Sequence, residues 1–135
     1  MSDGVAVVRQ LLLASSDLLA TVPASRIAAG PMPLGITLPA LSISSISSVD
    51  ENIPAPGATR FVRERVRVTA MSPNYPTVKA LIRKVRKALA DQAPEVAGLQ
   101  HVTVHTDGTG GDYMNDEASI RMSDQDVIVK FNEAR

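Results

Sequence analysis

The clearest pattern in the chain is a change of hydrophobic period between residues 60 and 90. Over residues 62–70, apolar and polar side chains alternate, which is typical of a strand with one buried face. After a break at residues 72–76, apolar residues recur every three or four positions, as along one face of a helix. Asn74 is a suitable N-cap, and Pro76 falls in the first turn, where its missing N–H loses no helical bond. This stretch predicts a strand that leads directly into a helix.

The two faces of the predicted strand differ in chemistry. One parity is apolar apart from a single carboxylate, and comprises Val62, Glu64, Val66, Val68 and Ala70. The other parity is polar and mostly basic, and comprises Arg63, Arg65, Arg67 and Thr69. Because successive side chains of a strand point to opposite faces, we expect the three arginines to project from the sheet away from the core.

The residues before this stretch predict a helix and a strand. An apolar face over residues 3–19 predicts an amphipathic helix, whose start Ser2 or Asp3 can cap. A strand is predicted over residues 38–48. The parity of its apolar residues changes near Ser44 and Ser45, which indicates a bulge there.

The residues after it predict two further strands. The first covers residues 99–106, with Val102 and Val104 on one face. The second covers residues 120–131, where the apolar parity changes part-way, so we expect a bulge over residues 123–126.

The predicted order is therefore helix, strand, strand, helix, strand, strand. It indicates an α+β fold in which a small, mostly antiparallel sheet of about four strands packs with two main helices. A chain of 135 residues suits one domain over residues 1–135 and needs no disulfide or metal to fold, and it contains no cysteine. Proline- and glycine-rich composition predicts mobile loops near residues 24–37, 49–59 and 107–119.

The apolar stretch at residues 5–22 does not predict a membrane segment. Arg9, Gln10 and Asp17 interrupt it, and it is too short and too polar to span a bilayer. It also lacks the basic start of a signal peptide. We expect no membrane partner.

The net charge of zero hides a strong asymmetry along the chain. Residues 60–90 contain nine basic residues and one acidic residue, whereas residues 91–135 contain three basic and nine acidic residues. A chain of this kind can meet nucleic acid with its middle, or a copy of itself head to tail.

The patterns that resemble metal or nucleotide sites lack the features such sites require. His101 and His105 are four apart on a predicted strand, roughly 13 Å by rise alone, too far for both to reach one ion easily. The glycine-rich residues 107–112 lack the lysine of a phosphate loop and the strand-to-helix context of a dinucleotide fingerprint. The later acidic residues have no EF-hand spacing. We expect no catalytic residue, no metal site and no cofactor.

The charged residues are the best candidates for a site. The arginines at positions 63, 65 and 67 predict an assembly surface or a wall that faces DNA. A basic surface is predicted on the exposed side of the helix, formed by Lys79, Arg83, Lys84, Arg86 and Lys87. An acidic assembly loop is predicted at Asp107, Asp112, Asp116 and Glu117. Aromatic platforms for single-stranded nucleic acid are absent, and a solvated helix face also explains the lysines.

Several segments together resemble a known family. They are the Leu/Ala-rich helix at residues 8–19, the segments 22–27 and 33–41, the strand at 65–70, the helix start at Asn74 and Tyr75, the helix end at 85–89, and the strand at 121–131 after an acidic loop. In their order and spacing they resemble the small tail-completion, or tail-terminator, proteins of long-tailed bacteriophages and prophages. The long 44–59 region and the aromatic-poor last strand depart from that pattern.

The resemblance implies a virion structural protein without enzymatic activity. Such proteins form a ring, commonly a hexamer, that closes the head-proximal end of the tail tube, ends tube growth and provides a surface for the head connector. The implied partners are the protein itself, the tail tube protein, the head connector and DNA that passes through the channel without sequence-specific binding. The implied location is the virion tail, after assembly in the host bacterial cytoplasm.

Three alternatives remain open at the level of sequence. One is another phage role, as a head–tail connector or minor tail component. A second is a small nucleic-acid-binding α+β domain, whose binding would depend steeply on salt. An enzyme is the third, although the sequence offers no credible nucleophile or base.

Overall fold

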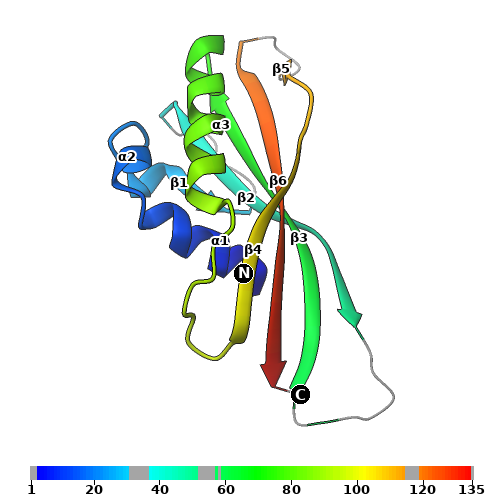
Figure 1. Cartoon of the computed structure of the whole chain (residues 1–135). Helices are drawn as coiled ribbons and strands as arrows, with labels where there is room; N and C mark the ends of the chain where they lie inside the picture. The colour runs from blue at the N-terminus through cyan, green and yellow to red at the C-terminus, as the bar shows by residue number, and fades with distance from the viewer. Residues whose placement is uncertain (1–2, 31–36, 52–56, 58, 115–118, 135) are drawn as a thin grey trace.

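One mixed sheet with helices against one of its faces forms the architecture (Figure 1). The structure is a computed structural model that describes residues 3–30, 37–51, 57, 59–114 and 119–134. The described helices are α1 (Asp3–Leu13), α2 (Ser16–Leu19) and α3 (Tyr75–Leu89), with a 3₁₀ turn at Ala24–Arg26. The described strands are β1 (Ile27–Ala29), β2 (Ala40–Glu51), β3 (Thr59–Ser72), β4 (Gln100–Thr109), β5 (Tyr113–Met114) and β6 (Arg121–Ala134).

The strand order is β1-β2-β3-β6-β4. The short strand β5 pairs with the first residues of β6, Arg121 and Met122. All pairs are antiparallel except β1 with β2, which run parallel. The predicted α+β class is confirmed, but the predicted four-strand sheet misses β1 and β5. These strands are three and two residues long, too short to show a period in the sequence.

Regular structure occupies part of each of the three regions predicted to be loops. The 3₁₀ turn and β1 occupy the start of the 24–37 region, and β2 continues to Glu51. At the third loop, β4 continues to Thr109, and β5 lies within the region predicted to be loop. Hydrogen bonding to neighbouring strands extends these elements past the point where the hydrophobic alternation ends.

The first helix is broken in two, where the sequence predicted one helix over residues 3–19. Ser15 has an extended backbone and caps α2, because its Oγ accepts a hydrogen bond of 3.3 Å from the backbone N–H of Leu18. A serine at this position competes with the helix for backbone hydrogen bonds and starts a new one. The predicted cap Ser2 lies outside the described residues.

The bulge predicted in β2 is confirmed, with a register shift between Ser45 and Ser47. The bulge predicted over residues 123–126 is wrong, because β3 and β6 pair without a shift from Thr59 opposite Ala134 to Ser72 opposite Arg121. The cause of the error is that the inner parity of β6 continues through two buried polar residues, Ser123 and Gln125. In the sequence alone, these two polar residues look like outward-facing positions, which mimics a change of the inner parity.

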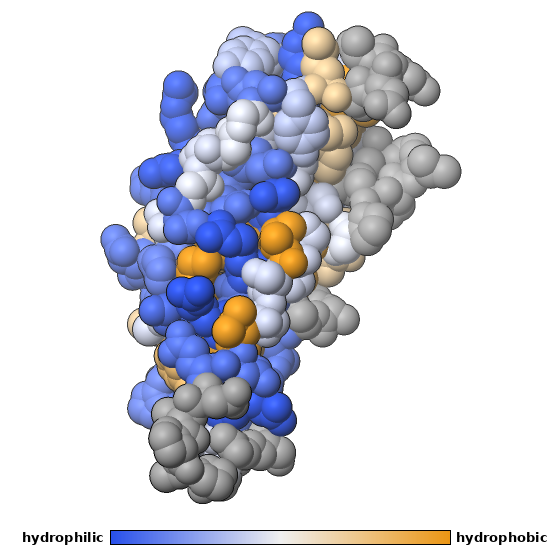
Figure 2. All heavy atoms as spheres, turned by 90° about the vertical axis from the view of Figure 1, so that its right-hand side faces the viewer, coloured by the Kyte–Doolittle hydropathy of each residue, from blue (hydrophilic) through white to orange (hydrophobic). Residues whose placement is uncertain are grey.

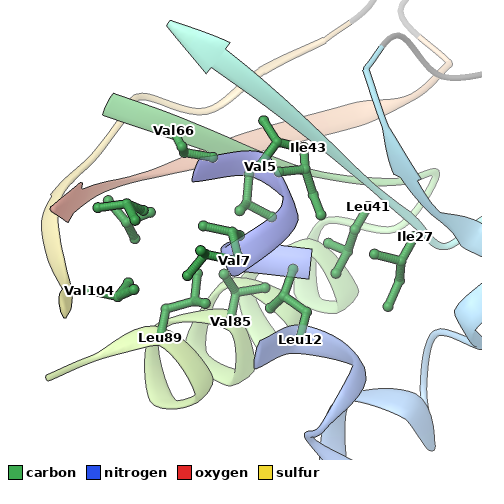
Figure 3. Close-up of a cluster of buried hydrophobic side chains, with 14 of the residues drawn as sticks. Val5, Val7, Leu12, Ile27, Leu41, Ile43, Val66, Val85, Leu89 and Val104 are labelled. Carbon is green, nitrogen blue, oxygen red and sulfur yellow. The ribbon is translucent and has the colours of Figure 1, made fainter. Parts of the chain in front are cut away.

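The core lies between the sheet and the two long helices. Helix α1 packs over β2 and β3, α3 packs over β3, β6 and β4, and the helices contact each other. Figure 3 shows side chains from α1, α3 and several strands meeting in this layer. Residues of the predicted inner parity of β3 are all buried, as is the predicted pair Val102 and Val104 of β4.

Glu64 is the carboxylate on that inner parity, and it lies at the N-terminus of α1. It is only 3% exposed, and its Oε1 accepts a hydrogen bond of 3.3 Å from the N–H of Gly4. A negative charge there offsets the partial positive charge of the helix N-terminus. A Cβ at position 4 would lie 2.5 Å from the carboxylate carbon, so this contact requires glycine.

Candidate functional site

The face of the sheet opposite the helices carries the arginines that the sequence singled out. We call it the outer face. Figure 2 views it and shows a mostly hydrophilic surface with separate hydrophobic residues. The strand register arranges its side chains in rows across the sheet. Three of these rows are Ser44, Arg67 and Asp126; Ser47, Arg65, Ile128 and His105; and Val49, Arg63, Lys130 and Thr103.

Arg65 and Arg67 are neutralised within the chain by acids of β6 and β4. Arg65 forms ion pairs with Asp107 and Asp126, and Arg67 Nε donates a 2.8 Å hydrogen bond to Asp126. The hydrogen bond that Arg65 donates to Asp107 raises the pKa of Arg65, and the hydrogen bond that Arg67 donates to Asp126 raises the pKa of Arg67. Conversely, the hydrogen bond from Arg67 lowers the pKa of Asp126. These arginines therefore hold three strands together through their charges.

Asp124 extends this network toward β5. It accepts hydrogen bonds from the Thr69 hydroxyl at 2.7 Å and from the Tyr113 hydroxyl at 3.0 Å. Burial raises the pKa of Tyr113, and the bond to Asp124 raises it further. Arg67 Nε also lies 3.8 Å from Asp124. The network thus anchors the short strand β5 to the outer face.

Arg63 differs from the other two arginines of β3. It lies directly opposite Lys130 of β6, and among the described residues neither of them forms an ion pair. Both line a hollow of about 180 Å³ on the outer face, with Ser47 and Val49 of β2 and His105 of β4 among its walls. The structure therefore brings the three predicted arginines onto one face but gives them two different environments.

The predicted basic surface of α3 is also divided. Lys79 Nζ donates to Asp112 at 2.6 Å, Lys84 Nζ donates to the Thr21 hydroxyl at 2.7 Å, and Arg86 donates to Thr109 and Gln125. Within the described part of the chain, Arg83 and Lys87 have no ion pair or side-chain hydrogen bond. Only these two remain as a solvated helix face.

The predicted acidic loop is not a single exposed patch. Asp107 lies in β4 and pairs with Arg65, and Asp112 accepts hydrogen bonds from Lys79 and from Tyr75. The bond from Lys79, followed by that from Tyr75, lowers the pKa of Asp112. The other two predicted residues, Asp116 and Glu117, lie outside the described residues.

The histidines do not converge on a common point. His101 is exposed, with a positive φ of 53° next to a register shift in β4, whereas His105 lines the outer-face hollow. In the ranges that the structure describes, no group of three or more His, Cys, Asp or Glu residues is placed to hold a metal ion.

The sequence did not identify the acids of β6 as partners of the arginines. Asp124 and Asp126 share one parity of β6, just as Arg65 and Arg67 share one parity of β3. This matched parity is the available signal. It becomes informative only when β3 and β6 are known to be neighbours.

Comparison with known proteins identifies the family. A family model described as Tail completion protein gp17 matches residues 6–127. The chain belongs to the tail completion protein gp17 family. This confirms the family that the sequence resembles, one of phage tail structural proteins. No curated protein matches the chain at a significant level.

Solved structures share the fold of this tail completion protein. A chain from a structure described as the virion of a native gene transfer agent particle matches with a TM-score of 0.69 and 16% identity. The match covers 97% of this chain and 99% of that one. A second solved structure matches with a TM-score of 0.64 and 14% identity, over 97% of this chain and 96% of that one. At these identities the likeness concerns the fold alone.

The helices of this tail completion protein are short. In the part of the chain that the structure describes, none has the length and apolar character needed to cross a membrane.

Proposed function

We propose that this protein forms a ring of six identical subunits. The ring closes the head-proximal end of a phage tail tube. The ring ends tube growth and offers the surface on which the head docks. The family match over residues 6–127 is the observation that carries the proposal. The shared fold with a chain of a gene transfer agent virion, covered over 99% of its length, supports a place within an assembled particle.

The proposed partners are other copies of the chain, the tail tube protein and the head connector. DNA passes through the ring without sequence-specific binding, and the chain has no enzymatic activity. The outer face supports this view, because Arg65 and Arg67 are engaged in ion pairs with Asp107 and Asp126 of the same chain. The proposed location is the virion tail, and assembly takes place in the host bacterial cytoplasm.

An open sheet edge supports protein–protein contacts. Strand β1 pairs only with Leu41 to Ile43, so in the described residues the rest of β2 has β3 on one side and no strand on the other. This stretch bears two exposed apolar side chains, Ile46 at 45% and Val49 at 49% exposure, and neither lysine nor proline. Sheet edges with exposed apolar side chains are sites where another chain can pack.

Deletion of the gene tests the function directly. Particles from the parent phage or prophage without this gene would be viewed by electron microscopy. We expect filled heads beside separate tails of unregulated length. Normal particles would remove the proposal and favour the nucleic-acid-binding alternative. Heads that have lost their DNA would indicate a head–tail connector instead.

A further inference from the structure

The pairing of Arg63 with Lys130 is unfavourable within one subunit. Residues directly opposite each other on antiparallel strands have Cβ atoms about 5 Å apart, and like charges at that spacing destabilise the sheet. In the next row Arg65 lies opposite the neutral Ile128, and one row further Arg67 lies opposite Asp126. Among the described residues, no acid forms an ion pair with either of these two cations. An anion from outside the subunit would therefore relieve the repulsion between the two cations.

The surroundings of the two cations form a site for a small anionic group. The hollow that they line measures about 180 Å³, which is room for a side-chain carboxylate and some water, since one water occupies about 30 Å³. Ser47 and His105 supply further polar groups on two different strands. Asp107 and Arg65 also line the hollow, and their charges offset each other because the two residues form an ion pair. Val49 adds an apolar wall that is 49% exposed and can pack against the stem of an incoming side chain.

The charge balance of the outer face favours a protein carboxylate over DNA. Polyanion binding requires a continuous track of free cations. Here Arg65 and Arg67 are neutralised by Asp107, Asp124 and Asp126. Among the described residues of this face, one local pair of cations is therefore free to receive a partner. One such pair fits one carboxylate.

The chain itself carries acids of the required kind. Apart from Asp3, which a side-chain hydrogen bond joins to Glu133, three exposed acidic residues form no ion pair within the described residues, and they are Glu51, Asp91 and Glu95. Glu51 lies on β2, two residues from the wall of the hollow. The other two lie on the connection from α3 to β4, which runs on the helix side of the sheet, away from the outer face (Figure 1). A head-to-tail contact joins two such different surfaces.

We propose that the hollow at Arg63 and Lys130 binds a carboxylate of the 91–95 corner of a neighbouring copy of this chain. This inference rests on the proposed ring and specifies one of its contacts. Each copy then supplies a cationic hollow to one neighbour and an acidic corner to the other. The unfavourable pairing of Arg63 with Lys130 in a single subunit is relieved only when the neighbour is in place.

Zero-length carbodiimide cross-linking of purified tails tests the contact. This reagent joins an amine to a carboxylate only when the two already form an ion pair. We expect Lys130 to be joined to Asp91 or Glu95 in a product of twice the mass of the chain, identified by mass spectrometry. Lys79 and Asp112, 2.6 Å apart within one chain, serve as an internal control, because their link leaves a product the size of one subunit that has lost one water.

Three results would overturn the proposal. They are a Lys130 that stays unmodified while the Lys79–Asp112 link forms, a Lys130 joined to a different virion protein, and an ultraviolet cross-link from this hollow to DNA. The result is separate from that of the gene deletion, because a copy-to-copy link at Lys130 can be found whether or not the tails are of regulated length.

A charge exchange provides a second test. The double variant Arg63→Glu with Lys130→Glu should weaken the contact about tenfold or more, since it replaces attraction with repulsion at a charge pair. We expect particle yield to fall accordingly and to recover when Asp91→Lys and Glu95→Lys are added in the same chain. The matched control is Arg83→Glu with Lys87→Glu on the solvated face of α3.

Circular dichroism of each purified variant establishes that it folds. Loss of particles with the folded Arg63/Lys130 variant and recovery with the exchanged chain would support the contact. Normal yield from the Arg63/Lys130 variant, or no recovery from the exchanged chain, would contradict it.

Discussion

At the scale of single residues, position on a strand decides whether a charge is free. Arg63, Arg65 and Arg67 are equivalent in sequence pattern and share one face. Their neighbours on β6 differ, however, and so do their charge partners. The face was predictable because alternation needs only local sequence. The partners were not, because they depend on which strand lies alongside.

Asp126 is the residue on which two of these arginines depend, and its removal should act in a pH-dependent way. The hydrogen bond from Arg67 lowers the pKa of Asp126, so its contribution to stability is present above the unfolded pKa of about 3.9 and is lost as the pH falls through the lower folded value. We expect Asp126→Asn to reduce the free energy of unfolding by about 1 kcal/mol at pH 7, since both arginines are partly exposed.

Urea unfolding at pH 7, 5 and 3 measures this effect. The deficit of the variant should be similar at pH 7 and 5 and should shrink at pH 3. Asp91→Asn, at an exposed position without an ion pair in the described residues, is the matched control. A deficit of equal size at all three pH values would show that Asp126 acts through packing and not through its charge.

At the scale of elements, the hydrophobic period predicted the principal strands and α3 but not their ends. The buried Gln125 is the most instructive case. Its side-chain oxygen accepts hydrogen bonds from Thr109 at 2.8 Å and from Arg86 at 3.1 Å, and its nitrogen donates to the backbone oxygen of Gly108 at 3.1 Å. The hydrogen bonds of this buried polar side chain are made with residues of β4 and α3. Sequence pattern alone cannot distinguish such a residue from one at the surface.

Loss of this network should loosen the end of β4. Gln125→Leu keeps the approximate size of the side chain but leaves the Gly108 carbonyl without its bond, so we expect a loss of about 1 to 3 kcal/mol in the free energy of unfolding. Hydrogen exchange of the amides around residues 108–110 should quicken with it. Gln100→Leu, at an exposed position of β4, controls for the exchange of glutamine for leucine itself. Equal stability of the two variants would show that the Gln125 bonds contribute nothing net.

At the scale of the whole molecule, the charge asymmetry along the chain largely cancels within the fold. The basic middle and the acidic end supply the two sides of the pairs on the outer face and of the pair between α3 and the segment before β5. The sequence correctly predicted opposite charges but not that many of them meet inside one subunit. Only the topology, with β6 beside β3, brings them together.

Weak binding to nucleic acid follows from this cancellation. We expect the isolated protein to show little affinity for a labelled DNA duplex at physiological salt in fluorescence anisotropy. The variant Asp124→Asn with Asp126→Asn releases Arg67, whereas Arg65 keeps its ion pair with Asp107. A cation freed to contact a phosphate should steepen the logarithmic salt slope by about 1. Tight, steeply salt-dependent binding by the wild type would instead favour the nucleic-acid-binding alternative.

The bulge between Ser45 and Ser47 has a consequence for how the chain can vary in length. Pairing with β3 is regular on both sides of Ile46, so this residue is surplus to the register. A chain without it would keep the same neighbours for Ser47 and Val49, and the hollow would keep its walls. The loss of one residue at this place therefore leaves the register of β2 intact, whereas the same change within the unbroken β3–β6 ladder would turn every later side chain to the opposite face.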